Sequence, residues 1–377
     1  MGVRLLARTL RGMEEVCAQE ITARGLGTVE RLRHREVWFT SDEPDARLLD
    51  LRTADDVFLV AAVIRGVGHT KADLARFTQP SRTAPWRRLL RLRGRCGGPA
   101  TANRIDVVAS YVGKRNYNRY DIEDTVGEQA AAALGLPHHS RRDGAVPDDG
   151  QPFPIRVTVE GTEAALAVRL TERPLHRRAY KQESVPGTLH PPLAAAMALL
   201  AGLSPGDRVL DPSCGTGTLL IESRLTVGGL RTLGTDHNPA ALAAAVANAT
   251  AAQPPGDTAM AQPPGDTAMA WAVGDTAMAW AVADAGRLPV ADGRADRVLS
   301  NPPWGLQVAP GGTLATRPAA YYEELRRVLK PGTGRAVLLL HDPETHLSLA
   351  RAAGLRVQDS RPVSLFGSHP AVVTLSG

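Results

Sequence analysis

The stretch Ser300-Asn-Pro-Pro-Trp-Gly305 places one amide, two prolines and one indole directly after a short apolar segment. Proline fixes φ at about −65° and has no backbone N–H, so the pair predicts a stiff loop. Proline keeps its carbonyl oxygen as an acceptor, and the side-chain oxygen of Asn301 is a second acceptor. The loop could therefore hold a planar group bearing an amine, with Asn301 and the carbonyl of Pro302 each accepting one amine hydrogen. Trp304 offers a flat face on which such a group could stack. The alternative for the hexapeptide alone is a structural Pro-Pro turn with Trp304 packed in the core.

A second motif, Asp211-Pro-Ser-Cys-Gly-Thr-Gly217, follows an apolar segment and precedes a helix expected from Thr218. Gly215 and Gly217 allow a backbone to approach a ligand without a Cβ in the way. The helix start favours negative charge. Leu220 occupies the sixth position of a possible G-x-G-x-x-G fingerprint, and no Gly-Lys-Ser/Thr follows. Both a dinucleotide fingerprint and a phosphate-binding P-loop are therefore excluded.

Two further acids follow the next expected strands. Asp236 ends the segment LRTLGTD, and Asp284 ends AMAWAVAD. A carboxylate at the end of a strand can accept both hydroxyls of a ribose, as in nucleotide-binding α/β folds. Asp284 could accept from an adenine amino group. Any one of these acids alone is most often a solvated residue at the end of a strand. The interpretation as a ligand site therefore rests on the ordered series of the glycine motif, Asp236, Asp284 and the Asn-Pro-Pro-Trp motif, each at the end of an expected strand.

The elements that must position these residues alternate between strand and helix from about residue 186 onward. Such alternation predicts a parallel sheet covered on both faces, with the strand ends meeting at one edge. A nine-residue repeat interrupts the order at 253–283, where QPPGDTAMA recurs in variants. We expect residues 253–276 to be a duplicated loop insertion, and only the last copy, beside Asp284, to form a strand. Lengthening a loop costs little, on the order of 0.6 kcal/mol per doubling.

Composition limits the class of protein. The 377 residues are too many for one ordinary core, and 43% are hydrophobic. No uncharged apolar run reaches 18 residues and the first residues lack a secretory h-region, so neither a membrane span nor a signal peptide is expected. Three scattered cysteines argue against a disulfide framework and a structural zinc site. We expect a cytoplasmic monomer without metal.

Positive charge gathers in the first half of the chain. Residues 1–190 carry a net charge of +6 and residues 191–377 a net charge of −1. Seven arginines and no acid lie within 76–95, a density that suits nucleic-acid phosphates. The alternative is an arginine-rich, solvated face.

On these motifs, residues 186–377 resemble the class I S-adenosylmethionine-dependent methyltransferases, and most closely the amino-methylating branch with [N/D/S]-P-P-[Y/F/W]. The segments that carry the resemblance are DPSCGTG, GTDHN, ADAGRLP and SNPPWG. It implies a seven-stranded, mostly parallel Rossmann-like sheet. It also implies a cofactor site made by Asp211, Pro212, Gly215, Gly217, Asp236, Asp284 and Asn301 and a catalytic loop made by Asn301, Pro302 and Trp304.

The first half resembles a THUMP domain, an RNA-binding module, within 107–130 and 157–180. The resemblance implies a ferredoxin-like domain over 1–65, a THUMP domain over 66–180 and a methyltransferase domain over 181–377. An RNA-binding loop would contain Lys114, Arg115, Asn116, Tyr117 and Arg119, since cations suit phosphates and Tyr and Asn suit bases. In such families the THUMP domain holds the 3′ CCA end of tRNA.

The whole chain thus resembles THUMP-bearing tRNA guanine-N2 methyltransferases of the acceptor stem. A ribosomal RNA guanine-N2 methyltransferase shares these parts, although such relatives often carry a second catalytic domain. A DNA amino-methyltransferase would lack the THUMP domain, and an inactive RNA-binding protein would have little use for the intact motif residues. The choice of guanine rests on the resemblance, because the hexapeptide alone also allows adenine, cytosine or a protein amide.

Overall fold

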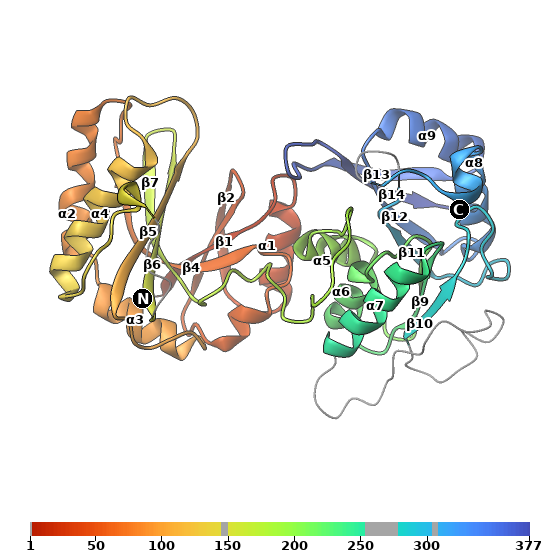
Figure 1. The fold of residues 1–377 in the computed structure, drawn as a ribbon, viewed down its shortest axis with the longest axis horizontal. Helices are drawn as coiled ribbons and strands as arrows, with labels where there is room; N and C mark the ends of the chain where they lie inside the picture. The colour runs from red at the N-terminus through yellow and green to blue at the C-terminus, as the bar shows by residue number, and fades with distance from the viewer. Residues whose placement is uncertain (1, 145–149, 253–277, 304–307) are drawn as a thin grey trace. The chain divides into compact units, whose positions relative to one another are not determined.

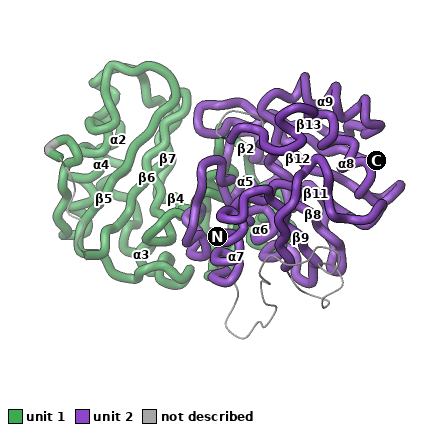
Figure 2. Tube along the Cα trace, turned by 45° about the vertical axis from the view of Figure 1, so that its right-hand side comes forward, with its two compact units in different colours: residues 1–9, 17–175 green, residues 10–16, 176–377 purple. Residues whose placement is uncertain are grey.

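The computed structural model describes residues 2–144, 150–252, 278–303 and 308–377. The chain divides into two compact units, which Figure 2 shows in different colours. Unit 1 comprises Met1–Thr9 and Cys17–Leu175, and unit 2 comprises Leu10–Val16 and His176–Gly377. The expected strand beside Asp284 is present as β10, and the predicted loop insertion over 253–276 lies outside the described residues.

Unit 1 is built on one seven-stranded sheet in the order β2-β3-β1-β4-β7-β6-β5. Its strands are β1 (Val3–Arg8), β2 (Thr28–Arg33), β3 (Glu36–Ser41), β4 (Asp56–Arg65), β5 (Arg104–Tyr111), β6 (Pro152–Glu160) and β7 (Glu163–Arg169). The strands β5 and β6 pair in parallel, and the other pairs are antiparallel. Because β4 pairs with β7, the segments expected as ferredoxin-like and THUMP domains share this sheet.

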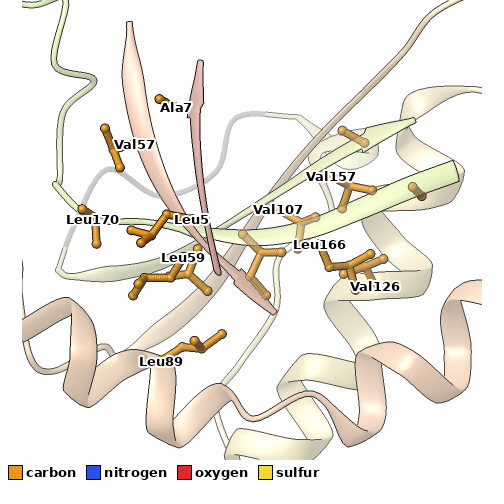
Figure 3. Packing of buried hydrophobic residues seen from close by; sticks show 14 of the residues in the cluster. Leu5, Ala7, Val57, Leu59, Leu89, Val107, Val126, Val157, Leu166 and Leu170 are labelled. Carbon is orange, nitrogen blue, oxygen red and sulfur yellow. The ribbon is translucent and has the colours of Figure 1, made fainter. Parts of the chain in front are cut away.

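The helices of unit 1 are α1 (Glu14–Ala23), α2 (Ala75–Thr83), α3 (Trp86–Arg95) and α4 (Arg119–Leu134), with 3-10 turns at Ala46–Asp50, Lys71–Leu74 and Arg141–Asp143. Alternating apolar residues of the strands meet apolar residues of these helices in one core (Figure 3). Leu89 of α3 and Val126 of α4, for example, pack with Leu59 and Val157 of the sheet. The arginine-rich stretch 76–95 is therefore largely helical, and its apolar positions hold it against the core.

Unit 2 has a second seven-stranded sheet in the order β10-β9-β8-β11-β12-β14-β13. Its strands are β8 (Arg208–Asp211), β9 (Arg231–Asp236), β10 (Met278–Val282), β11 (Arg297–Ser300), β12 (Arg335–Leu340), β13 (Arg356–Pro362) and β14 (Ala371–Ser376). Pairing is parallel from β10 to β12 and antiparallel through β14 and β13.

Helices cover both faces of this sheet (Figure 1). One core contains residues of α5 (Pro191–Leu200), α6 (Thr218–Thr226) and α7 (Pro239–Ala252). The core on the opposite face contains residues of α8 (Ala319–Val328) and α9 (Pro343–Ala352). The alternation expected from residue 186 onward therefore gives an α/β sandwich, and the ends of its parallel strands lie at one edge.

The segment Leu10–Val16 contributes to the core of unit 2 although it lies near the N-terminus. Leu10, Met13 and Val16 are 5%, 1% and 1% exposed, and they belong to the same apolar cluster as α5 and α6. The backbone N–H of Ser364 also donates to the carbonyl of Arg11 at 3.0 Å. Unit 2 is thus completed by residues far from it in sequence.

Candidate functional site

A cavity of about 660 Å³ lies at the carboxyl ends of the parallel strands of unit 2. Asp211 ends β8, Asp236 ends β9, Asn301 follows β11 and His341 follows β12, and all four line the cavity. Parallel strands carry their carboxyl ends to one edge, where ligands of open α/β sheets bind. Further parts of the wall come from the segment 185–190, the loop 213–216, the first turn of α6, the start of α7, and the turn between β13 and β14.

The Asn301 amide is oriented by a backbone carbonyl more than a hundred residues away in sequence. Its Nδ2 donates to the carbonyl of Gly187 at 3.2 Å. With the nitrogen so engaged, the side-chain oxygen is left as the acceptor. Pro302 and Pro303 line the cavity beside it. Trp304 lies outside the described residues, so its stacking role stays a prediction.

Asp211 is a buried carboxyl group at the floor of the cavity, 1% exposed. It accepts from the backbone N–H of Ser213 at 3.2 Å, and the Ser213 hydroxyl lies 2.9 Å from that of Ser300. Burial is the main cause that raises the pKa of Asp211 to about 8, and the negative charge of Asp236 adds to it. A cationic group bound here would favour the ionised carboxylate.

Asp236 connects the loop that contains Gly215 to the start of α7 through two hydrogen bonds. Its two carboxylate oxygens accept from the backbone N–H groups of Gly215 and Asn238, each at 2.9 Å. The carboxylate is nevertheless at the cavity wall and 9% exposed. It therefore holds the loop in place and can still present lone pairs to a ligand.

The two glycines of the motif differ in what they face. Gly215 has φ +51°, lines the cavity, and has open space on the side where a Cβ would point. Gly217 has φ +78°, and a side chain there would come within 2.6 Å of the Trp280 ring of β10. Gly217 does not line the cavity. The structure thus gives a packing reason for this glycine, and its expected part in cofactor binding stays a prediction.

Asp284 and Pro212 line a smaller neighbouring cavity. One oxygen of Asp284 accepts from the N–H and hydroxyl of Thr313, each at 2.7 Å, and the other accepts from the Gly286 N–H at 2.8 Å. Burial acts to raise the pKa of Asp284, but these hydrogen bonds outweigh it and lower the pKa. Ser213, His237 and Pro303 border both cavities, so an extended ligand could reach from one into the other.

Sequence reasoning missed several residues of the cavity. Gly187 lies in an ordinary Pro-Gly segment, His341 follows a strand without a motif, and Phe366 stands in a hairpin turn. Burial lowers the pKa of His341, and its Nδ1 has no hydrogen-bond partner among the described residues. Only the place of His341 after a parallel strand could have drawn attention to it.

In unit 1, the loop expected to bind RNA separates into supporting and exposed residues. Arg115 donates to the carbonyls of Gly68 and Gly161 at 2.7 and 2.6 Å and to the Tyr117 hydroxyl at 3.0 Å. Tyr117 is 3% exposed, and its hydroxyl donates to the Gly68 carbonyl at 2.9 Å. A ring so buried cannot stack on a base, so Tyr117 supports the loop instead. Lys114, Asn116 and Arg119 are exposed.

Helix α3 of unit 1 presents guanidinium groups to solvent. Trp86, Leu89 and Leu92 are buried against the core, whereas Arg87, Arg88, Arg91 and Arg95 are exposed. Arg93 is the exception, since it is buried and donates to the carbonyl of Leu170 at 3.1 Å. The stretch 76–95 therefore contains both a structural arginine and a solvated basic face.

Within the described ranges, no group of three or more His, Cys, Asp and Glu side chains could hold a metal ion. The helices of those same ranges include none long and apolar enough to cross a membrane.

The chemistry of the large cavity fits S-adenosylmethionine. Asp211 and Asp236 supply carboxylate oxygens for an ammonium group or ribose hydroxyls. Thr216 and Thr218 line the cavity at the start of α6, where backbone N–H groups favour a carboxylate. The open space at Gly215 lets a ligand approach the backbone closely.

Comparison with known proteins agrees with this chemistry. The RMKL-like methyltransferase domain family matches residues 178–371. A tRNA (guanine(6)-N2)-methyltransferase of Thermus thermophilus is 29% identical over 375 residues, which is 98% of each chain. The crystal structure of TrmN from Thermus thermophilus superposes with a TM-score of 0.74 at 28% identity and covers 99% of each chain.

A tRNA (guanine(6)-N(2))-methyltransferase THUMP3 of Bos taurus is 29% identical over 223 residues, 59% of this chain and 42% of that protein. The match of the domain family spans more than half of the 377 residues. It includes the motif residues that line the large cavity, namely Asp211, Gly215, Asp236 and Asn301. The α/β methyltransferase fold and the family predicted from those motifs are confirmed, and the chain belongs to the RMKL-like methyltransferase domain family, whose methyl donor is S-adenosylmethionine.

Proposed function

We propose that this chain methylates the exocyclic N2 amine of a guanosine in the acceptor stem of tRNA. The observation that carries the amine chemistry is the Asn301 side chain, which lines the cavity and whose nitrogen donates to the carbonyl of Gly187, so that its oxygen can serve as an acceptor. The choice of tRNA and of guanine follows the names of the Thermus thermophilus and Bos taurus relatives.

The amine of guanine is a weak nucleophile because its lone pair is delocalised into the ring. The Asn301 oxygen accepts one amine hydrogen and the Pro302 carbonyl accepts the other, which draws the nitrogen toward tetrahedral geometry. S-adenosylmethionine supplies a methyl group made electrophilic by the sulfonium. The two acceptors stabilise the positive charge that develops on nitrogen, and positioning supplies most of the rate. Attack on the methyl group releases the neutral thioether and leaves a cationic nitrogen that still carries both of its hydrogens. One of these hydrogens is acidic and leaves as a proton, so a strong general base is not needed.

Unit 1 would bind the RNA. We assign residues 1–65 to a ferredoxin-like domain and 66–180 to a THUMP domain. The sequence resemblance and the exposed cations of unit 1 support this assignment. Lys114, Asn116 and Arg119 would contact the 3′ CCA end, and the exposed arginines of α3 would contact phosphates. Trp304 would stack on the target base. We further propose that the protein acts as a monomer in the cytoplasm.

The direct test is to incubate the protein with labelled S-adenosylmethionine and total tRNA, and to identify the product by nucleoside mass spectrometry. N2-methylguanosine is expected. Methyladenosine or methylcytidine would overturn the base assignment, and methylation of ribosomal RNA in place of tRNA would overturn the substrate assignment.

The acceptor stem and the CCA end have their own test. If unit 1 holds the CCA end, the target guanine must lie a set distance from it. Moving that guanine by two base pairs along the stem should abolish methylation, and undiminished turnover would contradict the role of the CCA end.

A further inference from the structure

Phe366 stands exposed at the edge of the large cavity. Its side chain is 79% exposed, although it is a large apolar ring. The aromatic rings of Tyr180, Trp280, Tyr321 and Tyr322 in the same unit are buried. It also lines the cavity that contains Asn301 and Pro302. An isolated exposed apolar residue needs no explanation by itself, but one at the edge of a ligand cavity is a candidate contact.

The turn that carries Phe366 is unfavourable for its backbone. The turn is a two-residue hairpin, because Leu365 and Ser368 exchange hydrogen bonds of 3.0 and 2.9 Å between their backbones. Both central residues have positive φ, +47° at Phe366 and +85° at Gly367. Turns of this type strongly prefer Asn-Gly, and a bulky residue at positive φ is an outlier. The sequence therefore keeps an aromatic ring where an asparagine would fit the backbone better.

The surroundings hold the ring at the edge of the cavity. Leu365 is 7% exposed and Val363 is 2% exposed, and both pack in the core of unit 2. The Ser368 hydroxyl donates to the Leu365 carbonyl at 2.7 Å and closes the turn further. The rings of Phe366 and His190 pack in a T-shaped arrangement, with ring centroids 5.7 Å apart and an interplanar angle of 80°. His190 lines the same cavity.

We propose that Phe366 is a stacking face for the target base, which deepens the proposed function and rests on it. A planar heterocycle that brings its amine to Asn301 exposes two broad apolar faces, and an exposed ring at the edge of the same cavity can cover one of them. Every base has such a face, so Phe366 contributes affinity and orientation, whereas the amine acceptors choose the reacting atom. One stacked base is worth about 1–3 kcal/mol, which corresponds to roughly a 5- to 140-fold change in binding.

The experiment compares Phe366→Asn, Phe366→Leu and Phe366→Tyr in the full-length protein. Phe366→Asn removes the ring and supplies the residue that the turn prefers, so its Tm should equal or exceed that of the wild type. Methylation kcat/KM on RNA should fall about 5- to 140-fold in Phe366→Asn and Phe366→Leu. Phe366→Tyr keeps the planar face and should retain at least about half of the wild-type kcat/KM. The dissociation constant of S-adenosylhomocysteine should stay unchanged in all three.

A structural role for Phe366 would instead lower the Tm of Phe366→Asn, and that result would overturn the proposal. Wild-type kcat/KM in both ringless variants would overturn it too, as would an equal loss of S-adenosylhomocysteine affinity. The nucleoside product made by the wild type is measured with the same RNA. A product other than N2-methylguanosine refutes the proposed guanine, whereas the ratio of variant to wild type still reports whether Phe366 binds the base.

Discussion

The two ends of the Asn301 amide have separate tasks. Its nitrogen is fixed on the Gly187 carbonyl, and its oxygen is thereby turned into the acceptor that amine chemistry requires. Other cavity groups are held in the same way, since Asp236 is fixed by Gly215 and Asn238. Fixing a polar group before the ligand arrives means that little reorganisation remains for the reaction step.

Replacing Asn301 by Ala should lower kcat at least about tenfold while cofactor affinity changes little, because the missing acceptor acts mainly in the transition state. Single-turnover methylation of RNA and calorimetric titration of S-adenosylhomocysteine measure the two quantities. A matched loss of cofactor affinity would assign Asn301 to cofactor binding instead.

Asp211 predicts a pH dependence of stability in the cofactor-free protein. Its pKa is raised by burial to about 8, above the ordinary value for an unfolded chain, so the folded state binds the proton more tightly. Between about pH 4 and pH 8 the free energy of unfolding should therefore fall with rising pH on account of this group. In Asp211→Asn that component is absent, so the stability of the variant relative to wild type should rise from pH 5 to pH 9. Parallel urea unfolding curves at several pH values test this, and a constant difference would show that Asp211 is already ionised at pH 5.

At the scale of elements, one face of a helix can pack against the core while the opposite face stays exposed to a ligand. Helix α3 buries Trp86, Leu89 and Leu92 in the core of unit 1, while Arg87, Arg88 and Arg91 face solvent. The loop before α4 repeats this division, since Arg115 and Tyr117 hold the backbone and Lys114 and Arg119 are exposed. The resemblance to a THUMP domain made Arg115 and Tyr117 candidates for RNA contact along with the exposed residues, and the sequence left the stretch 76–95 open between a nucleic-acid contact and a solvated face.

The variant Arg87→Gln/Arg91→Gln should weaken RNA binding without lowering the Tm. If both arginines bind phosphates, the slope of log Kd against log salt should decrease by about 1 for each phosphate that no longer has an arginine beside it. Arg47→Gln/Arg317→Gln is the matched control, because these arginines are exposed and pair with Asp45 and Glu323. Equal RNA affinity for the α3 variant and wild type, measured by fluorescence anisotropy across salt concentrations, would remove α3 from the RNA-binding surface.

At the scale of the whole molecule, the order of the chain differs from the order of its compact units. Residues 10–16 belong to unit 2, and they bring Leu10, Met13 and Val16 into a core whose other residues begin at Tyr180. The later passage of the chain between the units lies between Leu175 and His176, five residues before the boundary predicted at 180/181. The assignment of 1–65 and 66–180 to two domains stays a prediction.

Met13→Ala should destabilise the methyltransferase unit although the substitution lies thirteen residues from the N-terminus. Met13 is 1% exposed, and a buried Met→Ala change typically costs about 2–5 kcal/mol. The volume-conserving Met13→Leu should cost less than about 1.5 kcal/mol. Thermal unfolding with and without S-adenosylhomocysteine identifies the transition that the ligand shifts. If Met13→Ala left that transition in place, the segment would not belong to the stable core of unit 2.

The sequence by itself determined the sheet edge at which the large cavity lies. Asp211, Asp236 and Asn301 each follow a strand of a β–α alternation, and parallel strands must bring their carboxyl ends together, so local pattern was sufficient to place them around one cavity. Only the tertiary structure decided that Gly187 orients Asn301, that Gly217 makes room for Trp280, and that Phe366 stands at the cavity edge. These contacts join residues far apart in the chain, and no periodicity or spacing encodes which distant backbone or ring will meet a given side chain once the elements pack.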